Sequence, residues 1–243
     1  MSFELSEIRQ ESDFLELLQV LFVAYEDPFN PVRPLFYPIL GHGPEARDTA
    51  IRESAERVFQ RHKQNPSGRW VKVTDSSTGR FVGAALWMFF DKDPYTAQSL
   101  PECAWWPEGE GREFANLWSW GIRGPRVRYM SKPHAYLNVC FVHPDFRRRR
   151  VGTLLLKWGL DMADGMGLEV FIDSSDHGKG LYERHDFVAA PCVIVDFNKD
   201  NPGGLWKSLQ QQCLPFRFWP MWRPVKGDYR GEKAFEPATL ETF

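Results

Sequence analysis

The stretch VHPDFRRRRVGTLLLKW, residues 142–158, joins four consecutive arginines to a glycine and an apolar run. The segment that leads into it, HAYLNVCFV (residues 134–142), is apolar enough to be a buried strand. Over residues 148–164 the apolar positions recur at the spacing of a helix; they are Val151, Leu154, Leu155, Trp158 and Met162. The arginines, Arg147 to Arg150, therefore stand where a strand turns into a helix.

A turn of this kind is chemically suited to bind phosphate. The first turn of a helix has unpaired N–H groups and about half a unit of positive charge. Gly152 lacks a side chain, so an anion can approach the backbone closely. Arginine side chains add charge-assisted bonds to phosphate oxygens. The stretch predicts a cradle for a small phosphorylated ligand, with a nucleic-acid patch and a targeting signal as the alternatives.

The charge balance of the chain disfavours both alternatives. The chain of 243 residues has 30 basic and 32 acidic residues, a net charge of −2, whereas a nucleic-acid-binding protein usually has a basic excess. The first residues, MSFELSEIRQE, are polar and partly acidic, unlike a secretory or mitochondrial signal. A local basic cluster on a near-neutral chain favours a small anionic ligand.

Composition predicts an intracellular protein with one sizeable core. Hydrophobic residues make up 43% of the chain, and its length fits a single domain over residues 1–243. The four cysteines are too widely spaced for a disulfide framework or a zinc site; they are Cys103, Cys140, Cys192 and Cys213. The apolar stretches are too short to span a bilayer. We expect a cytoplasmic protein with no metal and with no membrane or nucleic-acid partner.

The remaining periodic segments predict an α/β fold. Two helices come first, over residues 12–25 and 44–64, and a hairpin follows, with strands at residues 69–75 and 80–90. After the arginine stretch we expect a strand, a short helix and a further strand; their ranges are 168–173, 178–187 and 188–197. The order is helices, hairpin, then alternating strands and helices.

Two segments lack a clear period. Residues 91–133 contain four tryptophans and an acidic first half, and are too long for an ordinary connection. We interpret them as an insertion, either an acidic aromatic flap that attracts a cationic acceptor or a solvated loop with its own small core. Residues 198–243 form a C-terminal extension rich in Trp, Phe and Pro. Such a tail is expected to pack back on the domain.

The arginine stretch resembles motif A of the GNAT (Gcn5-related N-acetyltransferase) family, and the phrases KWGLDMADGMGLEVFIDSS (residues 157–175) and MWRPV (residues 221–225) look most like its fungal-type members. Matching residues include Val142, Pro144, Phe146, Arg147 and Gly152. The downstream GKGLYERHDF resembles motif B of the family through Leu181, Tyr182 and Phe187. The resemblance implies a central mixed, mostly antiparallel sheet flanked by helices.

The resemblance also implies a site for acetyl-CoA. The backbone of Phe141 and Val142 would bond the pantetheine arm, and Tyr182 would donate a proton to the departing thiolate. The N–H groups from Arg148 to Thr153 would hold the pyrophosphate, with added charge from arginine side chains. The full set expected to bind the co-substrate is Phe141, Val142, Arg147, Arg148, Arg149, Arg150, Val151, Gly152, Thr153 and Ser174.

The chain departs from the motifs at two positions where the family usually has glycine. Arg150 and Asp186 occupy them. If the backbone there needs a positive φ, a side chain is a cost; if the backbone of Arg150 is helical, its side chain could add a phosphate contact.

The general base is open among several residues. Asp173 comes first, and His134 and Glu26 are the other candidates, while Asn138 stands where fungal relatives often carry an acid. Ser174 and Ser175 could orient a substrate or cap a helix.

We therefore predict an N-acetyltransferase that transfers acetyl from acetyl-CoA to a primary amine of a small molecule or amino acid, acting as a monomer or homodimer. The amine would attack directly in a ternary complex. The alternative is a protein of the same fold that binds another acyl-CoA or ligand and has lost or changed acetyl transfer.

Overall fold

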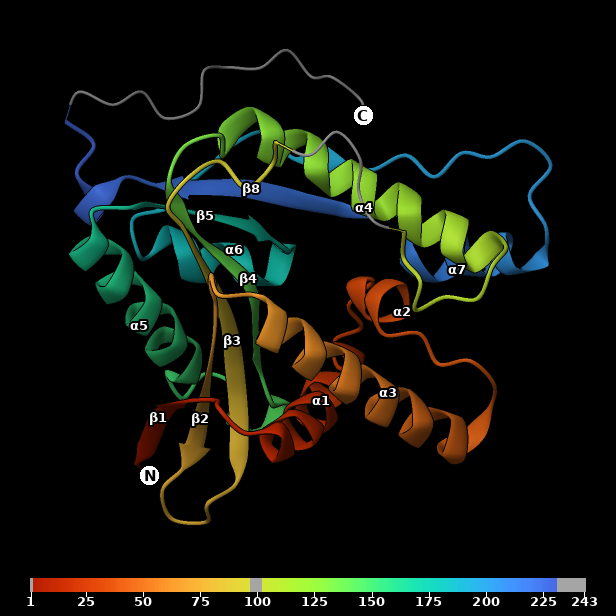
Figure 1. Cartoon of the computed structure of the whole chain (residues 1–243), viewed down its shortest axis with the longest axis horizontal. Coiled ribbons are helices and arrows are strands. Elements are labelled where there is room, and N and C mark those ends of the chain that lie inside the picture. Colours follow the sequence, from red (N-terminus) through yellow and green to blue (C-terminus); the bar gives the residue numbers. More distant parts are fainter. Residues whose placement is uncertain (1, 97–101, 231–243) are drawn as a thin grey trace.

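One sheet with helices on both faces dominates the computed structural model, which describes residues 2–96 and 102–230 (Figure 1). The strands of the sheet are β1 (Phe3–Glu7), β2 (Gly68–Asp75), β3 (Phe81–Phe90), β4 (His134–Val142), β5 (Glu169–Ser174), β6 (Val188–Ala189), β7 (Val193–Ile194) and β8 (Arg217–Arg223). The α-helices are α1 (Glu11–Glu26), α2 (Val32–Phe36), α3 (Gly43–Gln64), α4 (Glu110–Tyr129), α5 (Val151–Met166), α6 (Asp176–Glu183) and α7 (Gly204–Cys213).

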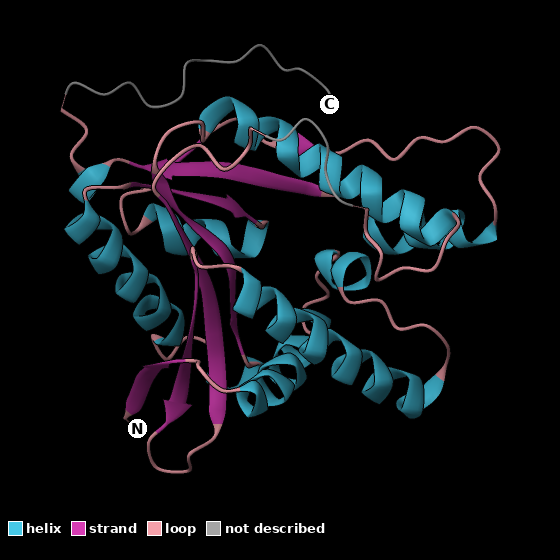
Figure 2. Ribbon diagram, viewed as in Figure 1, coloured by secondary structure: helices cyan, strands magenta, loops and turns pink. Residues whose placement is uncertain are grey.

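The strands run in the order β1-β2-β3-β4-β5-β8-β6, and β7 pairs with β8. Strands β4 and β5 pair in parallel, and the other described pairings are antiparallel. This arrangement confirms the predicted mixed, mostly antiparallel sheet flanked by helices, which Figure 2 shows as magenta strands between cyan helices.

The sheet opens between β4 and β5, and we call this opening the splay. The two strands pair from His134 opposite Glu169 to Leu137 opposite Ile172, and no further. At that point the register of β4 against β3 shifts, because Leu137 and Val139 pair with consecutive residues of β3 and Asn138 is left over as a bulge. Beyond the bulge, β4 continues to Val142 against β3 alone, while β5 continues beside β8. One edge of β4 is thus free of strand pairing from residue 138 to 142.

Each face of the sheet is covered by its own helices. Helices α5 and α6 pack on one face, where Trp87, Leu155 and Ile172 belong to one buried cluster. Helix α5 approaches β3 so closely that a Cβ at Gly159 would lie 1.9 Å from the Trp87 ring. Helices α1 and α3 cover the other face through a second cluster that includes Phe14 and Phe141. The free edge of β4 therefore lies between two packed layers.

Several predicted elements match the structure closely. The predicted helices at residues 12–25, 44–64 and 148–164 correspond to α1, α3 and α5, and the predicted strands of the hairpin correspond to β2 and β3. The single strand predicted over residues 188–197 was wrong, since only the two-residue strands β6 and β7 form there. Proline at position 191 interrupts the run, because it lacks the N–H that a ladder needs.

The two segments without a clear period contain regular structure. Residues 91–133 include the 20-residue helix α4, which packs against α7 through an aromatic cluster containing Phe114, Phe197 and Trp206. The C-terminal extension supplies α7 and β8, and β8 pairs with β5 inside the main sheet. Residues 97–101 of the insertion and 231–243 of the extension lie outside the described residues.

Candidate functional site

The arginine turn connects β4 to α5 at the open end of the sheet. A short 3-10 turn, Pro144–Phe146, is followed by residues with left-handed backbone at Arg148 (φ 59°) and Arg150 (φ 67°). Helix α5 begins at Val151, and Leu154 donates to the carbonyl of Arg150 at 3.0 Å. The N–H groups of residues 151–153 precede that bond and have no acceptor within the helix. This turn can present both backbone donors and positive charge to an anion.

The four arginine side chains have different surroundings. Arg147 donates from Nε to the Val142 carbonyl at 3.2 Å and from Nη2 to the Ala24 carbonyl at 2.9 Å, so it ties the turn to α1. The guanidinium of Arg149 lies 5.3 Å from the centre of the Phe146 ring. Arg148 and Arg150 are exposed. The role predicted for Arg147 at phosphate competes with this structural use of its guanidinium.

Both positions that usually carry glycine have a positive φ in this chain. Arg150 has φ 67° and is the residue before α5, and Asp186 has φ 63° just before Phe187. The left-handed region costs a residue with a Cβ about 1–2 kcal/mol. The backbone therefore keeps the conformation that glycine adopts freely, and the side chains are carried at a cost.

The variant Arg150→Gly is expected to be more stable than the native protein by about 1 kcal/mol, because it removes the left-handed strain. Lys157→Gly is the matched control: Lys157 is exposed inside α5, and glycine there should cost about 1 kcal/mol. Urea unfolding measures both. A destabilised Arg150→Gly would show that the Arg150 side chain makes a stabilising contact that outweighs its backbone strain.

Tyr182 lies next to the free part of β4. It belongs to α6, and its neighbour Leu181 packs against the first turn of α5, where a Cβ on Gly152 would lie 3.3 Å from Leu181 Cδ2. Its ring is buried and meets Phe187 edge-on at 5.9 Å. Burial, with Cys140 and Tyr25 nearby, raises the pKa of the Tyr182 phenol well above its ordinary value. Tyr182 is thus a protonated phenol near the splay, and its hydroxyl has no hydrogen-bond partner within residues 2–96 and 102–230.

Tyr25 and Cys140 accompany Tyr182 from the other elements around the splay. Tyr25 is on α1 and meets Phe141 of β4 edge-on at 6.3 Å. Burial raises the pKa of the Cys140 thiol to about 12. A thiol that remains protonated is a poor nucleophile, so its surroundings do not suit Cys140 to nucleophilic catalysis.

Asp173 is part of a buried network centred on Arg126 of α4. Arg126 Nε donates to Asp173 Oδ2 at 2.8 Å, and Arg126 Nη2 donates to the Tyr136 hydroxyl at 2.6 Å. That hydroxyl in turn donates to the same Asp173 oxygen at 2.8 Å. Burial opposes charge on Arg126, but Tyr136 and Asp173 outweigh it and raise the pKa of the guanidinium. The base role predicted for Asp173 competes with this ion pair.

The other candidate bases are also held by neighbours. The Glu26 carboxylate binds Arg47 through two bonds, of 3.1 and 2.9 Å. His134 is fully buried, its Nδ1 lies 2.6 Å from the Lys132 carbonyl oxygen, and burial lowers the pKa of its ring. Asn138 is exposed at the bulge of β4. None of these residues therefore supplies a carboxylate or imidazole that is free of protein partners and ready to act as a base at the splay.

The two serines after β5 serve the backbone. Ser175 caps α6 by accepting a bond from the Gly178 N–H at 3.4 Å. Ser174 is buried and donates to the Ser175 carbonyl at 2.8 Å. The cofactor contact expected of Ser174 would require its hydroxyl to turn from this carbonyl.

Sequence reasoning did not find Arg126 or Tyr25. Arg126 lies in the segment that showed no period, and its partner Asp173 is 47 positions away. Tyr25 ends a recognised helix, but nothing in the sequence indicates that this end faces β4. Only the tertiary arrangement brings these side chains to the splay.

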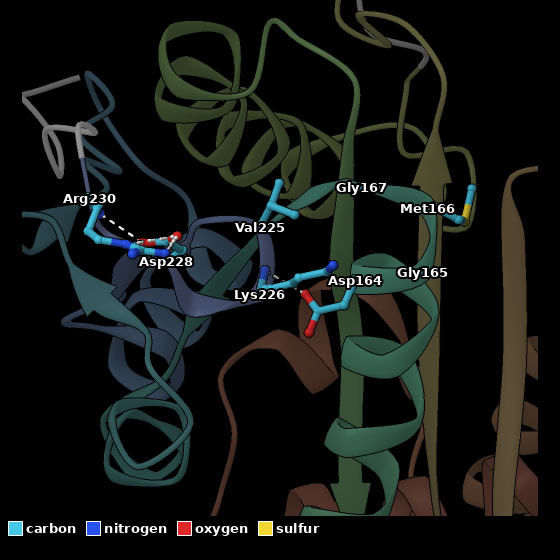
Figure 3. A pocket seen from close by; sticks show the side chains of 8 residues that line it. All are labelled: Asp164, Gly165, Met166, Gly167, Val225, Lys226, Asp228 and Arg230. Atoms are coloured by element: carbon cyan, nitrogen blue, oxygen red, sulfur yellow. Dashed lines mark hydrogen bonds and ion pairs between the residues drawn. The ribbon is translucent and has the colours of Figure 1, made fainter.

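A separate cavity of about 600 Å³ lies at the far end of α5, away from the arginine turn (Figure 3). Its carboxylates are already paired: Asp164 accepts from Arg223 at 2.7 Å and from the backbone N–H of Lys226 at 2.8 Å, and Asp228 pairs with Arg230. This internal pairing makes it a weaker candidate site than the splay.

The described part of the chain lacks two further kinds of feature. None of its helices is long and apolar enough to cross a membrane. Its His, Cys, Asp and Glu side chains do not gather in groups of three or more that could hold a metal ion.

Known proteins resemble this chain in sequence and in fold. A sequence model of the acetyltransferase (GNAT) family matches residues 34–187. The probable acyltransferase SID5 of Ajellomyces capsulatus is 29% identical over 92 residues, which are 37% of this chain and 60% of that protein. The match thus spans less than two thirds of that relative.

Solved structures share the fold at low sequence identity. The C-terminal condensation domain of Ebony in complex with beta-alanyl-dopamine is 13% identical with a TM-score of 0.62, covering 93% of this chain and 100% of that one. The mosquito protein arylalkylamine N-acetyltransferase-like 5b is 17% identical with a TM-score of 0.57, and the match covers 92% of this chain and 100% of that one. These likenesses concern the fold alone.

Proposed function

This chain belongs to the acetyltransferase (GNAT) family, and from that premise we propose that it transfers acetyl from acetyl-CoA to a primary amine of a small molecule or amino acid. The observation that carries the proposal is the convergence of three features at the splay. These are the free edge of β4, the first turn of α5 with its arginines, and the phenol of Tyr182.

The residues of the splay fit an acyl-CoA thioester. The edge of β4 that is free of strand pairing, which includes Phe141 and Val142, would offer backbone groups to an extended amide-containing arm, and the Val142 carbonyl would have to be shared with Arg147. The N–H groups of Val151, Gly152 and Thr153 would bind the pyrophosphate, with Arg148, Arg149 and Arg150 adding charge. Arg147 would hold the turn in place through its two carbonyl contacts.

We propose direct transfer in a ternary complex. As the amine nitrogen forms its bond to the thioester carbonyl carbon and the C–S bond breaks, Tyr182 donates its proton to the sulfur. The amine proton leaves to water, because the candidate carboxylates Asp173 and Glu26 are each held by an arginine. Asp173 has a positioning role here: with Arg126 it joins β5 to α4 at the edge of the splay.

The proposal includes a cytoplasmic monomer or homodimer that uses no metal and binds neither nucleic acid nor membrane. Its four cysteines are free thiols, which supports a reducing compartment. The net charge of −2 supports a small-molecule acceptor over a nucleic acid.

Arg148 gives the sharpest test of the cradle. Acetyl-CoA is expected to raise the unfolding midpoint of the native protein, because a ligand that binds only the folded state stabilises it by mass action. Arg148→Ala should lower the affinity by about 10-fold, the loss of one charge-assisted contact. Arg148 is exposed, so the ligand-free midpoint should stay within about 1 °C.

Lys207→Ala is the control for that measurement, because Lys207 is an exposed cation on α7; it should leave the acetyl-CoA shift intact. If acetyl-CoA gives no shift in the native protein, the proposed activity fails. A shift that Arg148→Ala retains in full would place the phosphates elsewhere.

One observation favours a second candidate function. Arg150 and Asp186 keep side chains at positive φ, a strain that selection would not be expected to maintain without a use. A protein of this fold that binds a longer acyl-CoA, or a related ligand without turnover, would account for such an altered turn. A midpoint shift that grows with acyl chain length, without product formation from acetyl-CoA, would support this reading.

A further inference from the structure

Arg33 of α2 is half-buried, and two nitrogens of its guanidinium are left without a partner among the described residues. Its Nε and Nη1 are both buried and have no hydrogen-bond acceptor within the described chain. Two aromatic rings lie against it: the Phe22 centroid is 6.0 Å and the Phe29 centroid 5.9 Å from its central carbon. A buried cation without an acceptor is costly.

The nearest acid is already in use. Glu26 lies close enough to affect Arg33, but both its oxygens accept bonds from Arg47. Arg47 itself stands over the same Phe22 ring at 5.6 Å, so a second positive charge adds to the first. Burial is the main cause that lowers the pKa of Arg33, and Arg47 lowers it further against the opposing effect of Glu26.

Two neighbouring arginines of α3 have fewer buried, unpaired nitrogens than Arg33. Arg57 donates from Nη2 to the Phe36 carbonyl at 2.6 Å and stands over three aromatic rings, Phe36, Tyr37 and Trp105; one of its nitrogens, Nε, is also buried without a partner in the described part of the chain. Arg61 stands over two of those rings, and none of its nitrogens is both buried and unpaired. Arg33 is the arginine of this region with two buried donors left open.

Arg33 also lies near the splay. Its guanidinium contacts Phe22. Tyr25 lies one turn further along α1, and the Cβ atoms of Phe22 and Tyr25 are about 5–6 Å apart. Tyr25 in turn contacts Phe141 on the free part of β4. Phe29, which covers one side of the guanidinium, is 43% exposed, so the covering side chain faces solvent and can be displaced.

We propose that Arg33 binds an anionic group, a carboxylate or a phosphate, carried by the amine acceptor. The planar guanidinium suits either group through paired N–H bonds. This inference rests on the proposed function only in assigning the anion to the acceptor. It narrows the acceptor from primary amines in general to amines with an acidic group a few bonds from the nitrogen.

Paired probes test the site without turnover. The unfolding midpoint is measured with 4-aminobutyrate against 4-aminobutanamide, and with O-phosphoethanolamine against ethanolamine, each up to about ten times its apparent Kd. In at least one pair the anionic member should raise the midpoint by about 3–6 °C and the neutral member should not. The pair that responds identifies the anion.

Variants assign the effect to Arg33. Arg33→Gln should lose the shift, and Arg61→Gln should keep it. Arg33→Met should raise the midpoint of the ligand-free protein, because it replaces an uncompensated buried charge by an apolar side chain. If Arg33→Gln does not fold, the difference between the anionic and neutral probes on the native protein, together with Arg33→Met, still tests the proposed anion site.

The proposal is overturned if anionic and neutral probes shift the midpoint alike or not at all, if Arg33→Gln keeps the shift, or if Arg33→Met lowers the ligand-free midpoint. Acetyl-CoA is measured in parallel, so that failure of acetyl transfer and failure of the anion site are separate results. An anion shift without an acetyl-CoA shift would leave the Arg33 site standing alone.

Discussion

Tyr182→Phe is expected to lower kcat by about 10²–10³-fold and to leave the affinity for acetyl-CoA unchanged. The substitution removes one hydroxyl, and a positioned proton donor contributes about 10²–10⁴-fold to a rate. The ring stays in place, because its packing against Phe187 does not involve the hydroxyl. The raised pKa of this phenol keeps it protonated through the neutral and mildly alkaline range, so loss of its proton should not limit the native rate there.

The measurement compares steady-state rates with the acetyl-CoA thermal shift in the same variant. Tyr95→Phe serves as the control, because within the described residues the hydrogen bond of the Tyr95 hydroxyl is a weak 3.8 Å contact with Met130 Sδ on the α4 side of the sheet. A Tyr182→Phe enzyme with near-native kcat would assign the proton to water and reduce Tyr182 to a packing residue. Loss of the acetyl-CoA shift would mean that the hydroxyl serves binding.

Local patterns in the sequence predicted the elements whose apolar residues follow a regular spacing or an unbroken run. Helix α5 has apolar residues at helical spacing, and β4 is a continuous apolar run, so both could be located to within a few residues. Strand β8 reads Arg217–Arg223 with Pro220 inside it and neither alternates nor runs apolar throughout. Its pairing with β5 on one side and with β6 and β7 on the other makes it a strand, and the pairing with β5 joins positions far apart in the chain.

Helix α4 was missed for a different reason. It contains Gly111, Gly121 and Pro125, residues that lower helix propensity. Close packing accounts for the two glycines: a Cβ on Gly111 would lie 2.3 Å from the Trp106 ring, and one on Gly121 would lie 2.4 Å from Val195. Tertiary contacts thus outweigh local propensity in this segment, and a period-based prediction could not find the helix.

Some residues of the candidate site could likewise be predicted from local sequence, and others depend on tertiary contacts. The arginine turn is contiguous in sequence, so its anion-binding chemistry could be predicted from Arg148 to Gly152 alone. The Arg126–Asp173 pair joins α4 to β5, and the open donors of Arg33 depend on which acids its neighbours have already engaged. Such features are properties of the folded arrangement and leave no local signal.

Arg126→Ala is expected to destabilise the protein by about 3–5 kcal/mol, the usual cost of removing one partner of a buried ion pair. The Asp173 side chain is only 9% exposed and that of Arg126 19%, so water cannot readily replace the guanidinium. Asp173 Oδ1 is already buried without a hydrogen bond. The variant would leave the carboxylate with the Tyr136 hydroxyl as its one remaining donor within the described residues.

Urea unfolding measures that loss, with Arg217→Ala as the control. Arg217 and Asp176 form a pair of the same length, 2.8 Å, but their side chains are 50% and 44% exposed, and such a surface pair contributes about 0–1 kcal/mol. Equal costs for the two variants would mean that water reaches the Arg126 site. The double variant Arg126→Met/Asp173→Leu should recover most of the loss, because it removes both charges together.

Asp173→Asn separates the structural role of this carboxylate from the catalytic role that the sequence suggested. The amide keeps the shape of the side chain but loses the charge that compensates Arg126. A positioning role predicts that stability falls by about 2–4 kcal/mol, while kcat of the folded fraction changes less than about 10-fold. A general-base role predicts, beside the same loss of stability, a loss of about 10²-fold or more in kcat of the folded fraction. Because the ion pair lies beside the splay, the two losses must be measured on the same preparation, and their ratio assigns the proton either to Asp173 or to water.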